Sequence, residues 1–302
     1  MTQITQIYTD FSHLRQVLCL VSCLLCLNAC VEDITLPLQG GTKMLVVEGG
    51  LTTDTLQHKI ILSLTNDFYD KSRPAPVSGA TVTITDGATV YTLTEDTAGV
   101  YLTPPFAARV GATYRLDVHC GEGDFWSESS IDYQINPIDS VVITEHYRRE
   151  NYLTMYIFVK DQAEIQNYYM GKVAVNDTLR NDSINRWFYI DDMYFNGRYI
   201  DGNFPVYSFK KEPDGEEDDY RVLQPDSRVT VYAYGISHDY YRFISEVNSS
   251  GSANPFMGPP APPRTNIQPA GKACGFFYVA SASRKSVVYL PKPDEPVMGG
   301  GE

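Results

Sequence analysis

The sequence predicts a mainly β protein, in which an immunoglobulin-like or transthyretin-like sandwich precedes a second antiparallel β domain with one short helix. Short runs rich in Val, Ile, Thr and Tyr recur along the chain, separated by Gly, Asp, Asn and Pro. Several of these runs alternate apolar with polar residues, which is the period of a half-buried strand. Only residues 237–248 have apolar residues at helical spacing instead.

The composition is that of a chain that buries a sizeable core. The protein has 302 residues, of which 43% are hydrophobic and 20% are charged, which is enough for one or two domains. Its formal net charge is -13, so nucleic acid and anionic lipid would repel it. We therefore expect no nucleic-acid partner.

The N-terminal residues have the features of a lipoprotein signal peptide, predicted over residues 1–29. The apolar run from Val17 to Leu27 is shorter than the roughly 20 residues that a membrane-spanning helix needs. The order Leu-Asn-Ala-Cys that ends at Cys30 resembles a bacterial lipobox. The predicted role of Cys30 is to carry the acyl chains that hold the mature protein on a membrane.

Two acidic residues, Glu32 and Asp33, follow this cysteine after Val31. They resemble the acidic signal that exports many Bacteroidota lipoproteins to the cell surface, and the alternative is that they are ordinary solvated charges. We expect a lipid-anchored protein of the outer membrane that faces the cell exterior. A short tether at residues 30–42 would follow the anchor.

The first β domain is predicted over residues 43–135. Its strands are expected at residues 43–52, 58–65, 80–94, 99–103 and 113–118. Val82 and Ile84 alternate with threonines, and the Asp86-Gly87 pair that follows is a hairpin signal. This alternation predicts a strand with its aliphatic side chains on one face.

Tyr101 ends the run "DTAGVY", which resembles a tyrosine pattern at strand ends of immunoglobulin-like sandwiches. In that pattern the ring is buried and the hydroxyl holds a neighbouring loop. The alternative for Tyr101 and Tyr114 is contact with a ligand.

The second β domain is predicted over residues 136–291, with its junction at the Asn136-Pro137 pair. Its strands are expected at residues 154–160, 168–175, 186–191, 206–209, 228–234, 275–281 and 286–290. Residues 237–248 form the predicted helix, with Ser237 capping its first turn. Residues 292–302 are expected to be a disordered tail.

The chain has six cysteines. Three of them leave with the signal peptide and Cys30 carries the lipid, so that only Cys120 and Cys274 remain. Oxidising export permits a disulfide between the two domains. The alternative is a pair of unpaired thiols.

No catalytic signature is present, so we expect neither an enzyme nor a cofactor. The four histidines of the mature chain (His58, His119, His146 and His238) have no metal-ligand spacing, and no nucleophile elbow or phosphate-binding glycine loop occurs. An enzymatic site assembled from distant segments stays a third alternative. Residues 212–219 offer several carboxylates, either as a solvated acidic loop or as a calcium site, although the spacing of a calcium loop is missing.

Aromatic residues are the most biased feature of the chain, with 22 tyrosines. Tyrosine is enriched at recognition surfaces but is also a good strand residue. Within residues 187–207 aromatic side chains mix with charged residues and glycines. We predict ligand or partner contacts at Trp187, Tyr189, Tyr194, Tyr199 and Phe204; the alternative is a hairpin that closes the second core.

Residues 249–269 form a long proline-rich segment. Loops of this length are commonly functional, and Phe256 is a further candidate contact. The alternative is a strap that Phe256 and Ile267 hold across the sandwich.

Several motifs resemble the domain of unknown function 4249 family of Bacteroidota lipoproteins. They are "LVVEGGLT" (45–52), "PVSGATVTI" (76–84), "HDYYRF" (238–243), "NPF" (254–256), "TNI" (265–267) and "GFFYVASAS" (275–283). The resemblance covers nearly the whole mature chain. It implies a two-part β lipoprotein of the outer membrane, commonly encoded near TonB-dependent transporters, without established catalytic residues.

From location and architecture we expect a non-enzymatic, surface-exposed lipoprotein. Its partner would be a TonB-dependent outer-membrane transporter, and the ligand that it captures would be a glycan or a peptide. The alternative function is that of an adhesin or structural cell-surface lipoprotein without a transporter.

Overall fold

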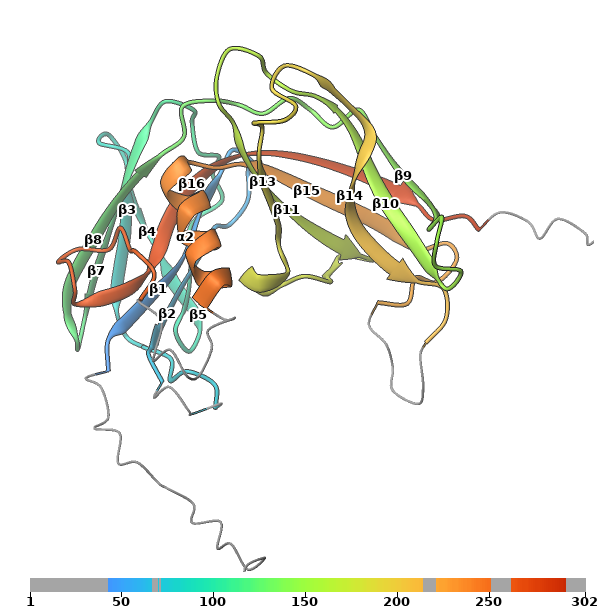
Figure 1. Cartoon of the computed structure of the whole chain (residues 1–302). Coiled ribbons are helices and arrows are strands. Elements are labelled where there is room, and N and C mark those ends of the chain that lie inside the picture. Colours follow the sequence, from blue (N-terminus) through green and yellow to red (C-terminus); the bar gives the residue numbers. More distant parts are fainter. Residues whose placement is uncertain (1–42, 67–69, 71, 214–220, 251–261, 292–302) are drawn as a thin grey trace, which may run out of the picture. The chain divides into compact units, whose positions relative to one another are not determined.

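The structure is a computed structural model that describes residues 43–66, 70, 72–213, 221–250 and 262–291. Its largest element is a nine-stranded sheet with the order β12-β11-β15-β16-β1-β2-β6-β5, in which β13 also pairs with β11 (Figure 1). The bounds of these strands are β12 (Thr178–Leu179), β11 (Tyr168–Val175), β15 (Arg228–Gly235), β16 (Ala273–Val288), β1 (Leu45–Thr52), β2 (Lys59–Leu64), β6 (Val100–Leu102), β5 (Thr94–Thr97) and β13 (Phe188–Asp191).

The first core lies between the β1 end of this sheet and a second sheet of four strands. That sheet has the order β4-β3-β7-β8, with β4 (Val90–Thr92), β3 (Thr81–Thr85), β7 (Thr113–Cys120) and β8 (Gly123–Ser130). Val82 and Ile84 are fully buried between the sheets, as their alternation predicts. The Asp86-Gly87 turn links β3 to β4, and Asp86 Oδ1 accepts the Thr89 N–H at 2.8 Å.

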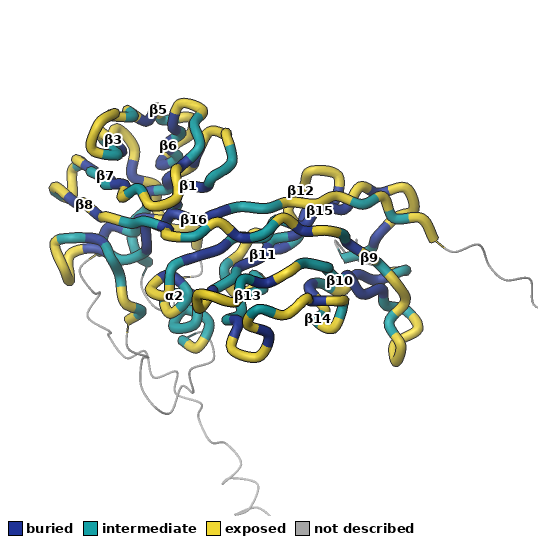
Figure 2. The backbone as a smooth tube through the Cα atoms, turned by 90° about the horizontal axis from the view of Figure 1, so that it is seen from above, coloured by how far each residue is buried: buried dark blue, intermediate teal, exposed yellow. Residues whose placement is uncertain are grey.

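The second core lies between the β11 and β15 end of the large sheet and a third sheet of three strands. That sheet has the order β14-β10-β9, with β14 (Tyr199–Lys210), β10 (Tyr152–Lys160) and β9 (Ser140–Glu145). Leu153, Met155, Val173 and Val231 meet in this core. Figure 2 shows buried stretches concentrated in the strands and exposed residues in the turns between them. The expected mainly β fold is confirmed, and the part of the chain that the structure describes contains one short α-helix.

The helix α2 (His238–Ser250) packs on the opposite face of the large sheet. Its start agrees with the predicted cap, because Tyr240 N–H donates to Ser237 Oγ at 3.3 Å. Tyr240 and Ile244 are its buried residues. The 3-10 turn η1 (Ile184–Arg186) precedes β13 on the same face.

The strands β8, β9 and β12 were not predicted, β5 overlaps a predicted strand only at Thr94, and two predicted strands are one. β8 carries only Phe125 as a large buried apolar residue, because its other inward position is Ser127. β9 begins shortly after Pro137, where the sequence predicts the domain junction and no strand. The segments predicted at 275–281 and 286–290 are joined in β16, which continues through the polar residues at 283–286 and pairs with β1 in parallel. This parallel pair is an exception to the expected antiparallel arrangement.

Strand β14 begins earlier than predicted, because Pro205 does not end it. β14 is an edge strand, and a register shift against β10 lies next to the Tyr156–Pro205 pair. A proline lacks the N–H that a central strand would need, but an edge strand with an irregular register tolerates it.

The predicted role of Tyr101 is confirmed. Its ring is 1% exposed, and its hydroxyl accepts the Ala80 N–H at 2.9 Å and donates to the Val77 carbonyl at 3.0 Å. The Tyr114 hydroxyl accepts the Arg109 N–H at 3.0 Å. Both tyrosines are therefore structural.

The segment before β16 is a strap in its described part. Ile267 is buried in the first core, and the Asn266 side chain bonds both the N–H and the carbonyl of Phe277. The strap is joined to β8 through two backbone hydrogen bonds between Trp126 and Gln268. Cys120 and Cys274 are both free thiols.

The large sheet runs through both predicted domains, because β16 pairs with β1 on one side and with β15 on the other. The described residues from Lys43 to Pro291 belong to one compact unit. The predicted signal peptide, tether and C-terminal tail lie outside the described residues.

Candidate binding site

The aromatic segment around β13 is divided between the two faces of the large sheet. In the register with β11, Tyr189 stands opposite Met170 and Phe188 opposite Gly171. Successive strand residues point to opposite faces. Trp187 and Tyr189 therefore pack on the α2 side, whereas Phe188 points toward the second core.

The surface of the sheet that carries Trp187 and Tyr189 is called the α2 face below. It is formed by Tyr168, Met170 and Lys172 of β11, by Tyr232 and Tyr234 of β15, by Phe276 and Tyr278 of β16, and by Tyr240, Tyr241 and Ile244 of α2. Ring centroids of Tyr240 and Tyr278 lie 4.2 Å apart, and those of Tyr189 and Tyr241 lie 5.7 Å apart. Burial raises the pKa of Tyr278 to about 12, so this end of the face is a packed core.

Lys172 is the unusual member of the α2 face. Its ammonium lies 4.1 Å from the Trp187 ring centroid and 5.9 Å from that of Tyr234. Burial, with a smaller contribution from Lys59, lowers the pKa of Lys172 to about 8. Cation–π contacts recover about 0.5–2 kcal/mol of the lost hydration. A lysine with such a pKa is a candidate functional residue.

A second feature is the turn at residues 192–198, which connects β13 to β14 and exposes apolar side chains. Met193 is 62% exposed and Tyr194 is 75% exposed, while Tyr199 at the start of β14 is 48% exposed. Phe195, between them in the chain, is buried and anchors the turn. Exposed apolar residues that cluster on one turn are typical of an interaction surface.

Buried carboxylates hold this turn in place. Asp161 is 4% exposed; its carboxylate accepts the Gly197 N–H at 2.7 Å and the hydroxyl of Tyr169. Asp192 accepts the Asn167 N–H at 2.9 Å, and burial raises the pKa of Asp192. The Lys160 ammonium donates to the Gly197 carbonyl at 2.6 Å. The turn is therefore fixed from inside while its tip faces solvent.

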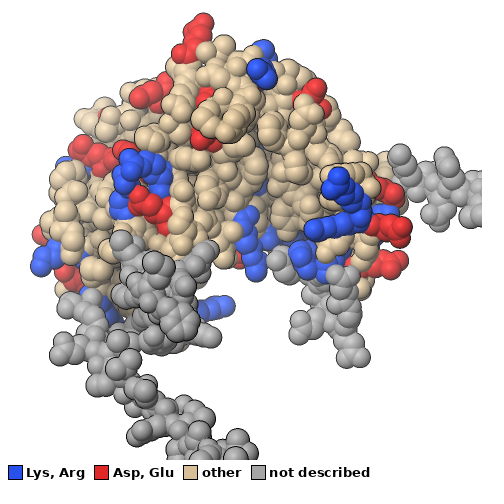
Figure 3. Space-filling model, viewed as in Figure 1, with Lys and Arg blue, Asp and Glu red and all other residues tan. Residues whose placement is uncertain are grey.

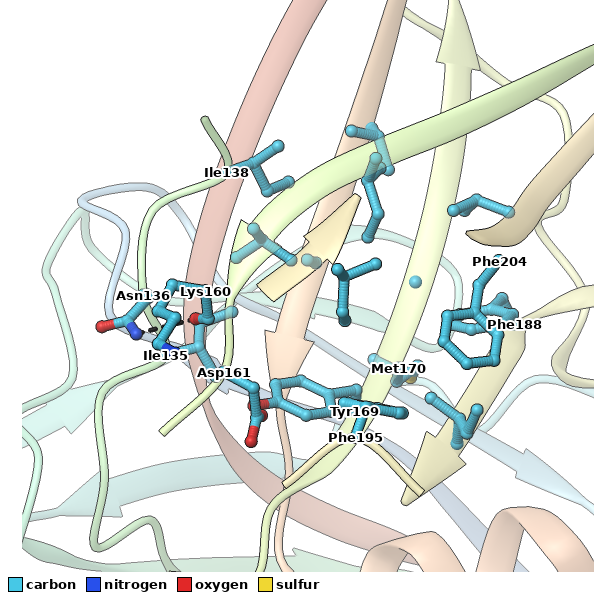
Figure 4. A pocket seen from close by; sticks show the side chains of 18 residues that line it. Ile135, Asn136, Ile138, Lys160, Asp161, Tyr169, Met170, Phe188, Phe195 and Phe204 are labelled. Atoms are coloured by element: carbon cyan, nitrogen blue, oxygen red, sulfur yellow. Dashed lines mark hydrogen bonds between the residues drawn. The ribbon is translucent and has the colours of Figure 1, made fainter. Parts of the chain in front are cut away.

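The second core contains an apolar cavity of about 60 Å³ between β10, β11 and β14. Figure 4 shows Asp161 and the Tyr169 hydroxyl meeting at one side of the cavity, with Phe188 and Phe204 at another. A cavity known to take up benzene is about 150 Å³. This cavity is too small for a sugar or for a peptide side chain as large as benzene. We therefore interpret it as a gap in the packing of the core and not as a ligand site.

The structure places the predicted contact residues in three environments. Trp187 and Tyr189 lie on the α2 face, Tyr194 and Tyr199 are exposed at the turn, and Phe204 lines the cavity. Whether any of them contacts a ligand stays a prediction. Cys30, Glu32, Asp33 and Phe256 lie outside the described residues, as do residues 214–219 of the acidic loop.

Lys172 was not predicted as a site residue. The strand sequence "YYMGKVAV" contains it as the only charged residue between apolar positions, which is a usable signal. Its aromatic neighbours come from β15 and from the end of η1, however, and no local pattern brings these segments together.

No described residues form a group of three or more His, Cys, Asp or Glu side chains suited to a metal ion. His58 has a structural role: one ring nitrogen donates to the Phe106 carbonyl at 2.8 Å, and the other accepts the Thr52 N–H at 3.4 Å. Burial lowers the pKa of His58. None of the helices in the described part of the chain has the length and apolar character needed to cross a bilayer.

A comparison with known protein families shows to which family the chain belongs. The model described as "Domain of unknown function (DUF4249)" matches residues 31–286. The chain belongs to the DUF4249 family. The resemblance predicted from the strand and helix motifs is thus confirmed, and the description of the family assigns no activity.

Other comparisons add little to the membership in the DUF4249 family. The structure of an adhesin, InvE of Yersinia pseudotuberculosis, is similar at 15% sequence identity over 65% of this chain and 58% of the adhesin chain. The TM-score is 0.20, which is too low to support a conclusion about fold or function. No curated protein matches the sequence.

Proposed function

We propose that this DUF4249 member is a non-enzymatic lipoprotein of the outer membrane that faces the cell exterior and captures a substrate for a TonB-dependent transporter. Cys30 carries the lipid, and Glu32 and Asp33 direct export. The transporter is the protein partner, and the substrate is a small ligand such as a glycan or a peptide fragment. The family membership and the lipobox-like sequence support this proposal.

The observation that carries the proposal is the exposed turn at residues 192–198. Apolar surface costs free energy in water unless a partner covers it. Because Asp161 and Asp192 hold the backbone of the turn, the backbone at Met193 and Tyr194 loses little conformational entropy on binding. A rigid apolar tip of this kind is suited to docking on a protein, and we assign it to the transporter.

The test is affinity purification of the full-length protein from gently solubilised outer membranes, with co-purifying proteins quantified by mass spectrometry. We expect a TonB-dependent barrel at near one-to-one ratio. The Cys30→Ser variant is the control, because without the lipid it should leave the membrane fraction. Recovery of the wild-type protein alone would contradict a transport role and favour a free-standing adhesin or structural lipoprotein.

A further inference from the structure

We infer that Lys172 and Trp187 form a binding site for an anionic group, a carboxylate or a phosphate, carried by the captured ligand. The inference rests on the proposed function in assigning this group to a captured ligand. The site itself is defined by two side chains that meet on the α2 face, one from the middle of β11 and one directly after η1.

Both side chains offer hydrogen-bond donors that the described part of the chain leaves unused. The Lys172 ammonium has three N–H donors, and its contacts are with the rings of Trp187 and Tyr234. The indole N–H of Trp187 is buried and also lacks a partner. Most buried donors in proteins are paired. The indole N–H of Trp187 is such a buried donor without an acceptor, whereas the Lys172 ammonium above the same ring is not among the buried unpaired atoms and is therefore open to an acceptor that comes from solvent.

The electrostatic surroundings favour an anion. Among the described residues no carboxylate contributes to the pKa of Lys172, and the one charged group that does contribute is another cation, Lys59. Arg284 of the adjacent β16 lowers the pKa of Tyr234, whereas Asp54 in the connection between β1 and β2 raises it. Figure 3 shows Lys and Arg atoms beside Asp and Glu atoms on the face that it draws, in a chain whose net charge is -13.

Flat side chains flank the ammonium. Tyr232 pairs directly with Lys172 in the register of β11 and β15, so both side chains lie on the same face. The ring contacts of Tyr241 on α2 are with Tyr168 and Tyr189, whereas Lys172 lies further along β11. A ligand with a flat apolar part beside its anionic group would therefore have a ring to stack on.

A purely structural lysine would be expected to look different. Long cationic side chains usually extend along apolar surface until the ammonium reaches water or a carboxylate. Lys172 ends over the rings of Trp187 and Tyr234 and not at a carboxylate, and desolvation lowers its pKa. An anionic ligand would restore the lost stabilisation of the charge.

The test uses the fluorescence of Trp187 in the full-length protein purified in mild detergent. The chain has two tryptophans, so the Trp126→Phe variant leaves Trp187 as the single reporter. Sodium benzoate, inorganic phosphate and neutral benzyl alcohol are titrated at pH 7 and constant ionic strength. We expect a saturable change in emission with benzoate, phosphate or both, and none with benzyl alcohol. A response to only one anion identifies the chemical group.

Lys172 is then replaced in the same background. Lys172→Met should weaken binding of the anion by about ten-fold or more, because it removes the charge-assisted hydrogen bonds, while Lys172→Arg should retain binding. Lys285→Met is the matched control, because Lys285 stands opposite Val231 and so lies on the other face of the same sheet. Equal affinities in the Lys172→Met variant and its parent would overturn the inference.

A folded parent protein that responds to neither anion would also overturn it. Because the titration contains no transporter, its result is independent of the co-purification. If anions bind in the titration but no transporter co-purifies, only the transport role is contradicted. If a transporter co-purifies but the fluorescence does not respond to anions, only the anion site is contradicted.

Discussion

The hydroxyl of Tyr101 joins two segments of the first core. We expect Tyr101→Phe to lower the free energy of unfolding by about 1–3 kcal/mol, because it leaves the Ala80 N–H and the Val77 carbonyl without their partner. Tyr114→Phe removes one bond, to the Arg109 N–H, and should cost less. Urea unfolding of both variants measures the difference. Equal losses would show that the two bonds of Tyr101 do not add to stability.

Lys172 should lower the stability of the protein in the absence of a ligand. Its pKa falls from 10.5 to about 8 on folding, so the penalty is complete below pH 8 and disappears as the pH rises toward 10.5. We expect Lys172→Met to raise the free energy of unfolding by about 1–3 kcal/mol at pH 7. The gain should shrink when the measurement is repeated at pH 10, and a gain independent of pH would contradict the argument.

Tyr101 and Lys172 show which roles of single residues the sequence can predict and which it cannot. The role of Tyr101 follows from neighbours in a short local pattern, and it was predicted. The environment of Lys172 comes from Trp187 and Tyr234, which are distant in the sequence. It is defined only when β11, β13 and β15 pair.

Among the elements, the turn at residues 192–198 depends on Gly197. Its φ is +69°, and an added Cβ would lie 2.6 Å from the Ala163 Cβ. We expect Gly197→Ala to weaken the turn by about 1–3 kcal/mol and to speed amide hydrogen exchange at residues 192–198. Gly87→Ala is the matched control, because Gly87 has a φ of +88° but no atom within 4 Å of the added Cβ. Similar effects in both variants would mean that the close contact does not matter.

The strands show why some elements escape prediction. β3 and α2 have clear periods and start or stop signals, and they were found. β8 hides its period because one of its inward residues is Ser127, and β16 is interrupted by Arg284 and Lys285. The exposed aromatic turn was predicted as a recognition surface by composition, but its buried supports, Asp161 and Asp192, require the tertiary structure.

At the scale of the whole molecule, β16 links the two cores, so we expect residues 42–302 to unfold as one cooperative unit. Trp126 lies on β8 in the first half and Trp187 lies at η1 in the second. Single-tryptophan variants, Trp126→Phe and Trp187→Phe, report on each half during denaturation in urea. After correction for the stability of each variant by circular dichroism, the fluorescence and dichroism midpoints should coincide. Separate midpoints within one variant would support two independent domains with a boundary near Asn136.

The central claim is that the fixed apolar turn docks on a transporter. The most direct test compares the ratio of co-purified TonB-dependent barrel to bait for the wild-type protein, for the double variant Met193→Ser and Tyr194→Ser, and for the control Tyr147→Ser. Tyr147 is 77% exposed on another loop. We expect a near one-to-one ratio for the wild-type protein and the control, and a loss of the barrel for the double variant. An unchanged ratio in the double variant, with its expression and surface exposure intact, would contradict it.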